Sequence, residues 1–398
     1  MVSMTPRRIL VALALALLLL TGATVVRRPA AGPVLHTIVL GADPGNVAVD
    51  GATGHAFVVD RNTNGYAALG QGNVSMIDTR AGTVLRTAQA GADPREAVID
   101  ARNGHVLVAN DDDASVSVLD ARSGALLGTA HVGSHPHNVA VDEQTGRAFV
   151  VNSGDGSVSV LDARRAVVLR TVRLGTDFVL SGVAVDARTG RVFVGDTSGA
   201  ANLVHVLDAR TGAIRGAPAS SSAASSYPMA PYSSGLYATD DMAVDPAPVA
   251  GAPDGRVFMV SSASLRTFDA RTGRTLRTAT VGGIASAIAL DASRHRVYVA
   301  SINGVDANGI PSGPGRVTVF DERSGAVLRV VDAGMTPRAL GVDTGTGHVV
   351  VVDAGGSVTV PDAWAWIPAG IRRRLPFLNS PLRTRAVPAS VSVLDLSR

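Results

Sequence analysis

A repeat constrains this chain more than any other feature of its sequence. Seven copies each contain a short apolar segment that ends in aspartate, at Asp78, Asp120, Asp162, Asp208, Asp269, Asp321 and Asp395. A similar segment precedes each of them and ends at Asp50, Asp100, Asp142, Asp186, Asp245, Asp291 and Asp343. The closest like markers lie 42 residues apart, and a strand-rich unit of that length is typical of one blade of a β-propeller. The repeat therefore predicts an all-β, seven-bladed β-propeller.

The third copy shows how a blade is built. Four short strands are predicted over 138–142, 147–152, 157–162 and 167–174, and we expect them to run antiparallel from the propeller axis outward. The first is nearly all apolar, as a strand buried on both faces should be. The recurring aspartates precede glycine-containing turns, where Asp bonds nearby backbone and Gly accepts positive φ. We predict that they are structural.

The ends of the chain predict how the ring closes. The sequence stops just after Asp395, where the outer strand of the last blade is due. Residues 33–43 match the outer strand and following loop of the third copy, 166–177. We therefore expect the N-terminal strand to complete the last blade, which removes an open sheet edge.

Residues 1–32 have the pattern of a targeting segment. Arg7 and Arg8 precede an apolar run from Ile9 to Leu20, which fits an export signal. Counted to Val26, the run has 18 residues and just reaches the length of a membrane span. Both interpretations place residues 33–398 outside the cytoplasm, either secreted or anchored to the cytoplasmic membrane.

Composition excludes several function classes. The chain has no cysteine, which excludes disulfides, thiolate metal sites and covalently attached haem. A net charge of +3 and 4% aromatic residues give no nucleic-acid footprint. Motifs for a serine nucleophile, a zinc protease or a phosphate-binding loop are absent from the sequence, and no cofactor is predicted.

The repeat also resembles a known family. The succession NVAVD, TGRAFVVN and SVSVLDAR in the third copy resembles the YVTN-type β-propeller repeat family, with Phe149–Asn152 at the place of its eponymous tetrapeptide. The resemblance covers about residues 33–398. It implies a seven-bladed, lactonase-like ring that serves as a general scaffold for binding, with some enzymes on related rings.

Irregular spacing locates the expected functional face. Extra residues fall between the second and third strands, as insertions over 61–73, 302–315 and 354–390, and in one connection between blades, over 216–240. Because strands alternate in direction, these loops share one face with the loops that join successive blades. Variable loops on a regular scaffold usually carry binding, although neutral drift of loop length gives the same pattern.

Two clusters on this face are candidate sites. His135 and His137 flank a proline and are weak candidates for metal ligands, with ordinary polar loop residues as the alternative. Asp111 and Asp112 begin a run of three aspartates that suits Ca²⁺ or a solvated turn. Three other histidines align with arginines at the start of the second strand, which predicts surface turn residues: His55, His105 and His348.

Aromatic residues within two insertions are further candidates for binding. Tyr227, Tyr232 and Tyr237 lie in a Ser/Ala/Pro-rich loop that forms either a lid or a mobile segment. Trp364 and Trp366 precede three arginines. Segment 364–378 therefore predicts either membrane contact, alongside the apolar segment 9–26, or an apolar cap that packs on the ring. Segment 357–360 is an alternative third strand for the last blade.

These observations favour an exported scaffold that binds a protein or small molecule on the variable loop face. The alternative is a metal-assisted, lactonase-like hydrolase or a redox-cofactor dehydrogenase subunit. Its site would lie at the channel mouth and use His135, His137 and Asp111.

Overall fold

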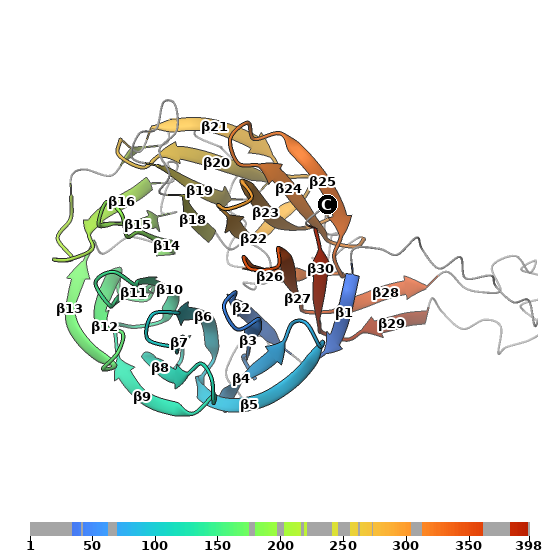
Figure 1. The fold of residues 1–398 in the computed structure, drawn as a ribbon, viewed down its shortest axis with the longest axis horizontal. Coiled ribbons are helices and arrows are strands. Elements are labelled where there is room, and N and C mark those ends of the chain that lie inside the picture. The colour runs from blue at the N-terminus through green and yellow to red at the C-terminus, as the bar shows by residue number, and fades with distance from the viewer. Residues whose placement is uncertain are drawn as a thin grey trace, which may run out of the picture.

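The fold is a ring of antiparallel sheets. The structure is a computed structural model that describes residues 34–40, 43–62, 70–174, 180–196, 203–215, 219–220, 241–245, 255–261, 263–272, 274–303, 313–360 and 383–396. These residues form seven four-stranded blades around a central axis (Figure 1). All described helix or strand elements are strands. The prediction of an all-β, seven-bladed propeller is confirmed.

Six blades are each built from four consecutive strands, ordered from the axis outward. Blade 1 contains β2 (Pro44–Asp50), β3 (His55–Asp60), β4 (Gln71–Asp78) and β5 (Thr83–Ala92). Blade 2 contains β6 (Pro94–Asp100), β7 (His105–Asn110), β8 (Ser115–Asp120) and β9 (Leu126–His131). Blade 3 contains β10 (Pro136–Asp142), β11 (Arg147–Asn152), β12 (Ser157–Asp162) and β13 (Val167–Arg173).

The next three blades repeat this order. Blade 4 contains β14 (Leu180–Asp186), β15 (Arg191–Asp196), β16 (Leu203–Asp208) and β17 (Ala219–Ser220). Blade 5 contains β18 (Asp241–Asp245), β19 (Arg256–Ser261), β20 (Ser264–Asp269) and β21 (Thr275–Thr280). Blade 6 contains β22 (Ile284–Asp291), β23 (Arg296–Ile302), β24 (Arg316–Asp321) and β25 (Val327–Asp332).

Blade 7 joins the two ends of the described chain. Its strands are β26 (Pro337–Asp343), β27 (His348–Asp353), β30 (Ser390–Asp395) and β1 (Val34–Val39), in that order. β1 pairs antiparallel with β30, with Thr37 opposite Ser392 (Figure 1). The predicted closure by the N-terminal strand is confirmed.

A separate hairpin lies between the second and third strands of blade 7. β28 (Gly356–Val360) pairs with β29 (Arg383–Val387), and the pair projects from the ring beside β1 and β30 (Figure 1). β30, and not segment 357–360, is therefore the third strand of the blade. The first and last parts of the insertion after β27 thus pair with each other and form an added two-stranded ribbon at the edge of the ring.

Apolar residues between neighbouring blades hold the ring together. Seven buried clusters span the seven blade interfaces. The third residue of each second strand is buried and mostly aromatic: Phe57, Leu107, Phe149, Phe193, Phe258, Tyr298 and Val350. Fully burying one such aliphatic or Phe side chain contributes about 1.5–3 kcal/mol to the free energy of folding. The hydrophobic core therefore lies between the blades.

The repeated aspartates stabilise turns, as predicted. Asp142 Oδ1 accepts hydrogen bonds from the Gln144 and Thr145 amides at 3.0 and 3.3 Å, and its Oδ2 accepts one from the Thr145 hydroxyl at 2.7 Å. The Ser123 hydroxyl and amide likewise hold the pKa of Asp120 below its usual range. These turns occupy one end of the ring, which we call the turn face.

The first residue of the second strand has a different environment from the one expected. Arg147 donates to the carbonyl oxygen of Ala209 in the next blade at 3.2 Å, and Arg256 is only 4% exposed. In three blades this position is histidine, and each Nδ1 is buried without a hydrogen-bond partner: His55, His105 and His348. These three histidines are each the first residue of a second strand and are half-buried, rather than the exposed turn residues that the sequence predicts.

The predicted targeting segment, residues 1–32, lies outside the described residues and stays a prediction. Across the part of the chain that the structure describes, no helix is long and apolar enough to cross a membrane.

Candidate functional site at the channel mouth

One backbone hydrogen bond recurs at the end of the ring opposite the turn face. The residue after the second strand donates its N–H to the carbonyl of the residue before the first strand of the same blade. The distance is 3.0 Å in four blades, for Arg61 to Asp43, Asp111 to Asp93, Ser153 to His135 and Ala354 to Thr336. The two kinds of loop therefore share one face, as predicted, and we call it the loop face.

The side chains on this repeated backbone differ from blade to blade. Before the strand-initiating proline stand Asp43, Asp93, His135 and Thr336 in blades 1, 2, 3 and 7. After that proline stand Gly45, Arg95, His137 and Arg338. In blades 2, 3 and 7 the pairing register shifts just after the proline, so this residue lies in a β-bulge. Such bulges re-aim side chains and are frequent beside binding sites.

A chain of ion pairs crosses the loop face, beginning between blades 7 and 1. Arg338 Nη1 lies 2.6 Å from Asp43 Oδ1, and Arg61 Nη1 lies 3.9 Å from Asp43 Oδ2. Arg61 then reaches blade 2, where its Nε lies 2.6 Å from Asp93 Oδ1. Burial lowers the pKa of Arg61, but the neighbouring Asp93 and Asp43 carboxylates outweigh this effect and raise it. Arg61 therefore stays charged.

Arg95 continues the chain within blade 2. Its Nη2 lies 2.7 Å from Asp93 Oδ2 and 2.9 Å from Asp111 Oδ2. Asp111 Oδ1 in turn lies 3.4 Å from His135 Nδ1 of blade 3. Asp93 and Asp111 are buried, with side chains 4% and 8% exposed. Charges held this far from water are screened less by salt than surface pairs. The network therefore links four adjacent blades, blades 7, 1, 2 and 3, by contacts that salt weakens little.

Glu96 forms a second polar layer on the inner strands. Its Oε1 accepts a hydrogen bond from Asn46 Nδ2 of blade 1 at 3.2 Å. Its Oε2 accepts the Val139 amide of blade 3 at 2.7 Å. One carboxylate next to Arg95 in the sequence thus links the inner strands of blades 1, 2 and 3.

The two candidate histidines occupy different environments. His135 is exposed at 56% of its side chain and faces Asp111. His137 is partly buried, and desolvation together with the Arg95 charge lowers its pKa, which favours neutral imidazole. Asp112 is exposed and follows Asp111 in the chain. The structure therefore groups His135 with Asp111 and Asp112, whereas the site predicted from the sequence grouped His135 and Asp111 with His137.

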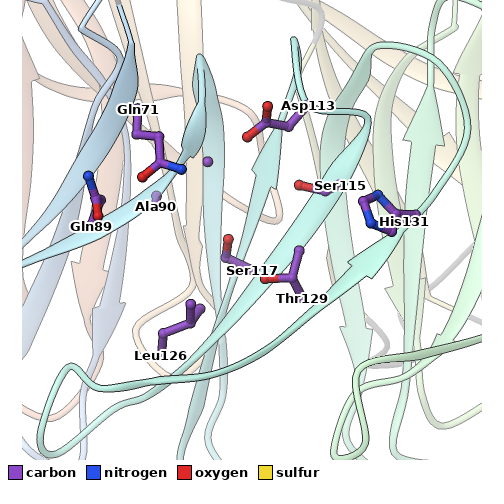
Figure 2. Close-up of a pocket in the computed structure, with 10 residues that line it drawn as sticks. Gln71, Gln89, Ala90, Asp113, Ser115, Ser117, Leu126, Thr129 and His131 are labelled. Carbon is purple, nitrogen blue, oxygen red and sulfur yellow. The ribbon is translucent and has the colours of Figure 1, made fainter.

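A hollow of about 340 Å³ lies between blades 1 and 2. Figure 2 shows Gln71 and Gln89 on one side and Asp113, Ser115 and His131 on the other. Gly91, Ala90, Ser117, Leu126 and Thr129 complete the lining. Asp113 of the aspartate run lines the hollow, together with hydroxyl, amide and apolar groups.

Part of this lining belongs to the repeat. Asn110 Nδ2 donates to the hydroxyls of Ser115 and Ser117 at 3.0 and 2.9 Å. The same arrangement recurs in blade 3 between Asn152, Ser157 and Ser159, at 2.9 Å for both bonds. The serines are therefore scaffold. Asp113, the third residue of the aspartate run, accepts a hydrogen bond from the Ala92 amide at 2.6 Å and lines the hollow (Figure 2).

Sequence reasoning missed most of the ion-pair chain and could not be tested at the aromatic candidates. The sequence interpretation gave no role to Arg61, Arg95 or Arg338, although a different charge at aligned positions of the repeat is the signal that identifies them. Tyr227, Tyr232, Tyr237, Trp364 and Trp366 lie outside the described residues.

Comparisons with known proteins extend the fold assignment only. The scan against protein-family models finds no matching family, so the YVTN-type resemblance stays a prediction. The search of curated proteins finds no relative. Among solved structures, a chain described as Kuenenia stuttgartiensis hydrazine synthase is similar, with a TM-score of 0.60 and 14% sequence identity. The match covers 79% of this chain and 93% of that chain. At this identity the likeness shows a shared propeller fold.

Proposed function

We propose that this protein is a binding scaffold that holds a protein or small-molecule ligand on the loop face of blades 7, 1, 2 and 3. One observation carries the proposal: side chains at three aligned loop positions differ between these blades, while the backbone hydrogen bond beneath them is the same. The turn face instead repeats one aspartate turn. Binding residues concentrate on loops that a rigid scaffold positions.

The chemistry of the face defines the kind of ligand. The Arg95 and Arg338 side chains are 25% and 17% exposed, and acidic groups alternate with them along the loop face. A ligand that supplies acceptors would meet the exposed guanidinium donors. We therefore propose a ligand with charged or hydrogen-bonding groups. We also propose that the protein meets it outside the cytoplasm, because the pattern of residues 1–32 predicts export.

A steric block on each face tests this proposal. Ser134 on the loop face and Gln144 on the turn face are exposed residues of the same blade. The full chain, tagged and purified from its native host, should lose about tenfold or more of its bound partner with Ser134→Trp, equivalent to about 1.4 kcal/mol of binding free energy. Gln144→Trp should leave recovery unchanged. Equal recovery from both variants would overturn the proposal.

A further inference from the structure

Three ligand-type side chains converge where blades 2 and 3 meet on the loop face. In the described part of the chain, Asp111, Asp112 and His135 form one group whose ligand atoms all lie within 4.8 Å of one another. Two come from the loop after β7 and one from the loop before β10. Metal–ligand distances near 2.0–2.2 Å require a closer approach. Asp112 and His135 are exposed, and a change of side-chain rotamer at these two residues would bring the ligand atoms closer.

A buried, unsatisfied oxygen points to a missing ligand at this place. Asp111 is 7% exposed, and its Oδ1 accepts no hydrogen bond from the described residues. That oxygen faces His135 Nδ1 at 3.4 Å. Leaving a buried acceptor unpaired costs about 1–3 kcal/mol, and more for a charged group. A cation between the carboxylate and the imidazole would remove this cost.

The backbone holds both loops in place without a ligand. The Asp111 amide donates to the Asp93 carbonyl at 3.0 Å. The His135 carbonyl accepts both the amide and the hydroxyl of Ser153 at 3.0 Å. Arg95 Nη2 holds the other Asp111 oxygen at 2.9 Å. Partners that orient a ligating carboxylate in this way strengthen metal binding, so Asp111 and the backbone of both loops are already in place.

The donor set selects the class of ion. One imidazole nitrogen with two carboxylates suits Zn²⁺, Mn²⁺ and related divalent ions, whereas Ca²⁺ takes six to eight oxygen ligands. We propose that Asp111, Asp112 and His135 bind one divalent transition-metal ion, with coordination positions left open toward solvent. The site deepens the proposed function, because an open position on the ion would serve as a contact for the ligand of the loop face.

Zinc titration of the full chain tests this site directly. The chain is stripped of metal by chelation and dialysis, then titrated with ZnCl₂ by calorimetry, and separately with MnCl₂. We expect one equivalent of Zn²⁺ to bind and to raise the melting temperature. Asp112→Asn and His135→Gln should each weaken binding by about tenfold or more, since even outer partners of a metal typically contribute 10–100-fold. Both residues are exposed, so the fold should be unchanged.

Two matched variants distinguish this site from adventitious zinc. Asp113→Asn and His131→Gln change the same residue types nearby but outside the cluster, and should leave zinc affinity within about twofold. Near-UV circular dichroism of each apoprotein confirms folding. Zinc binding that survives Asp112→Asn and His135→Gln, or the absence of stoichiometric binding, would overturn the site. Because no partner is required, failure here is distinguishable from failure of the proposed function.

Discussion

Replacing Arg256 with alanine should lower the free energy of unfolding by about 3–5 kcal/mol near pH 7.5, the usual cost of breaking a buried ion pair. Arg256 is 4% exposed at the interface of blades 5 and 6. Its Nη2 lies 2.8 Å from Asp245 Oδ2 and also contacts Glu322 Oε1, while Nη1 donates to the Glu322 carbonyl at 2.7 Å. Without the guanidinium, two buried carboxyl groups lose their cation. Urea unfolding measures the difference.

Arg147→Ala is the matched control for this prediction. Arg147 starts the second strand of blade 3 just as Arg256 starts that of blade 5, and it too reaches the next blade. Its guanidinium donates to the carbonyl oxygens of Ala209 and Arg210. Losing such hydrogen bonds should cost about 1 kcal/mol. Equal losses for the two variants would show that the buried carboxylates do not depend on Arg256.

Glu322→Gln should abolish a pH dependence of stability that the native chain shows between about pH 4.5 and 7. Burial, together with the adjacent Asp245, raises the pKa of Glu322 to about 7. The folded chain therefore keeps a proton that the unfolded chain has already released. The stability from this proton is fully present below pH 4.5 and is lost as pH rises through 7. A rise from 4.5 to about 7 corresponds to about 3 kcal/mol.

Comparison with the variant isolates this one group from the other acids. Urea midpoints of the native chain and Glu322→Gln are measured in steps from pH 4.5 to 7.5. Their difference in unfolding free energy should shift in favour of glutamine by up to about 3 kcal/mol over this range. A difference that stays constant would mean that Glu322 is ionised in the folded state at acidic pH, held so by Arg256 and His295, which lies 2.9 Å from its Oε2.

Local patterns made the fold predictable from sequence. Strand alternation and turn aspartates recur in every blade, so each copy confirms the others. Even the closure between β1 and β30 follows from the sequence, because residues 33–43 repeat the outer strand of blade 3. Segment 357–360 was ambiguous, since its apolar alternation suits both a blade strand and the hairpin that it forms.

The candidate site was only partly predictable, because its contacts join different blades. Asp111 and His135 are 24 positions apart in the sequence, and only the ring brings the end of β7 next to the entry of β10. A column-by-column alignment of the repeats would have shown the relation, since Arg61 and Asp93 make the equivalent contact one blade earlier. The same alignment also identifies Glu322 as unusual, because the equivalent residues in two other blades are Ala121 and Ala163.

Site-specific photocrosslinking tests most directly the central claim that the loop face binds the ligand. A photoreactive phenylalanine analogue is placed at Ser134 or at Gln144 in the full chain, and cells of the native host are irradiated. The two residues are exposed at opposite ends of blade 3. Position 134 should yield a discrete adduct, and position 144 should yield none. Adducts from position 144 alone, or equally from both positions, would contradict the assignment of the binding face.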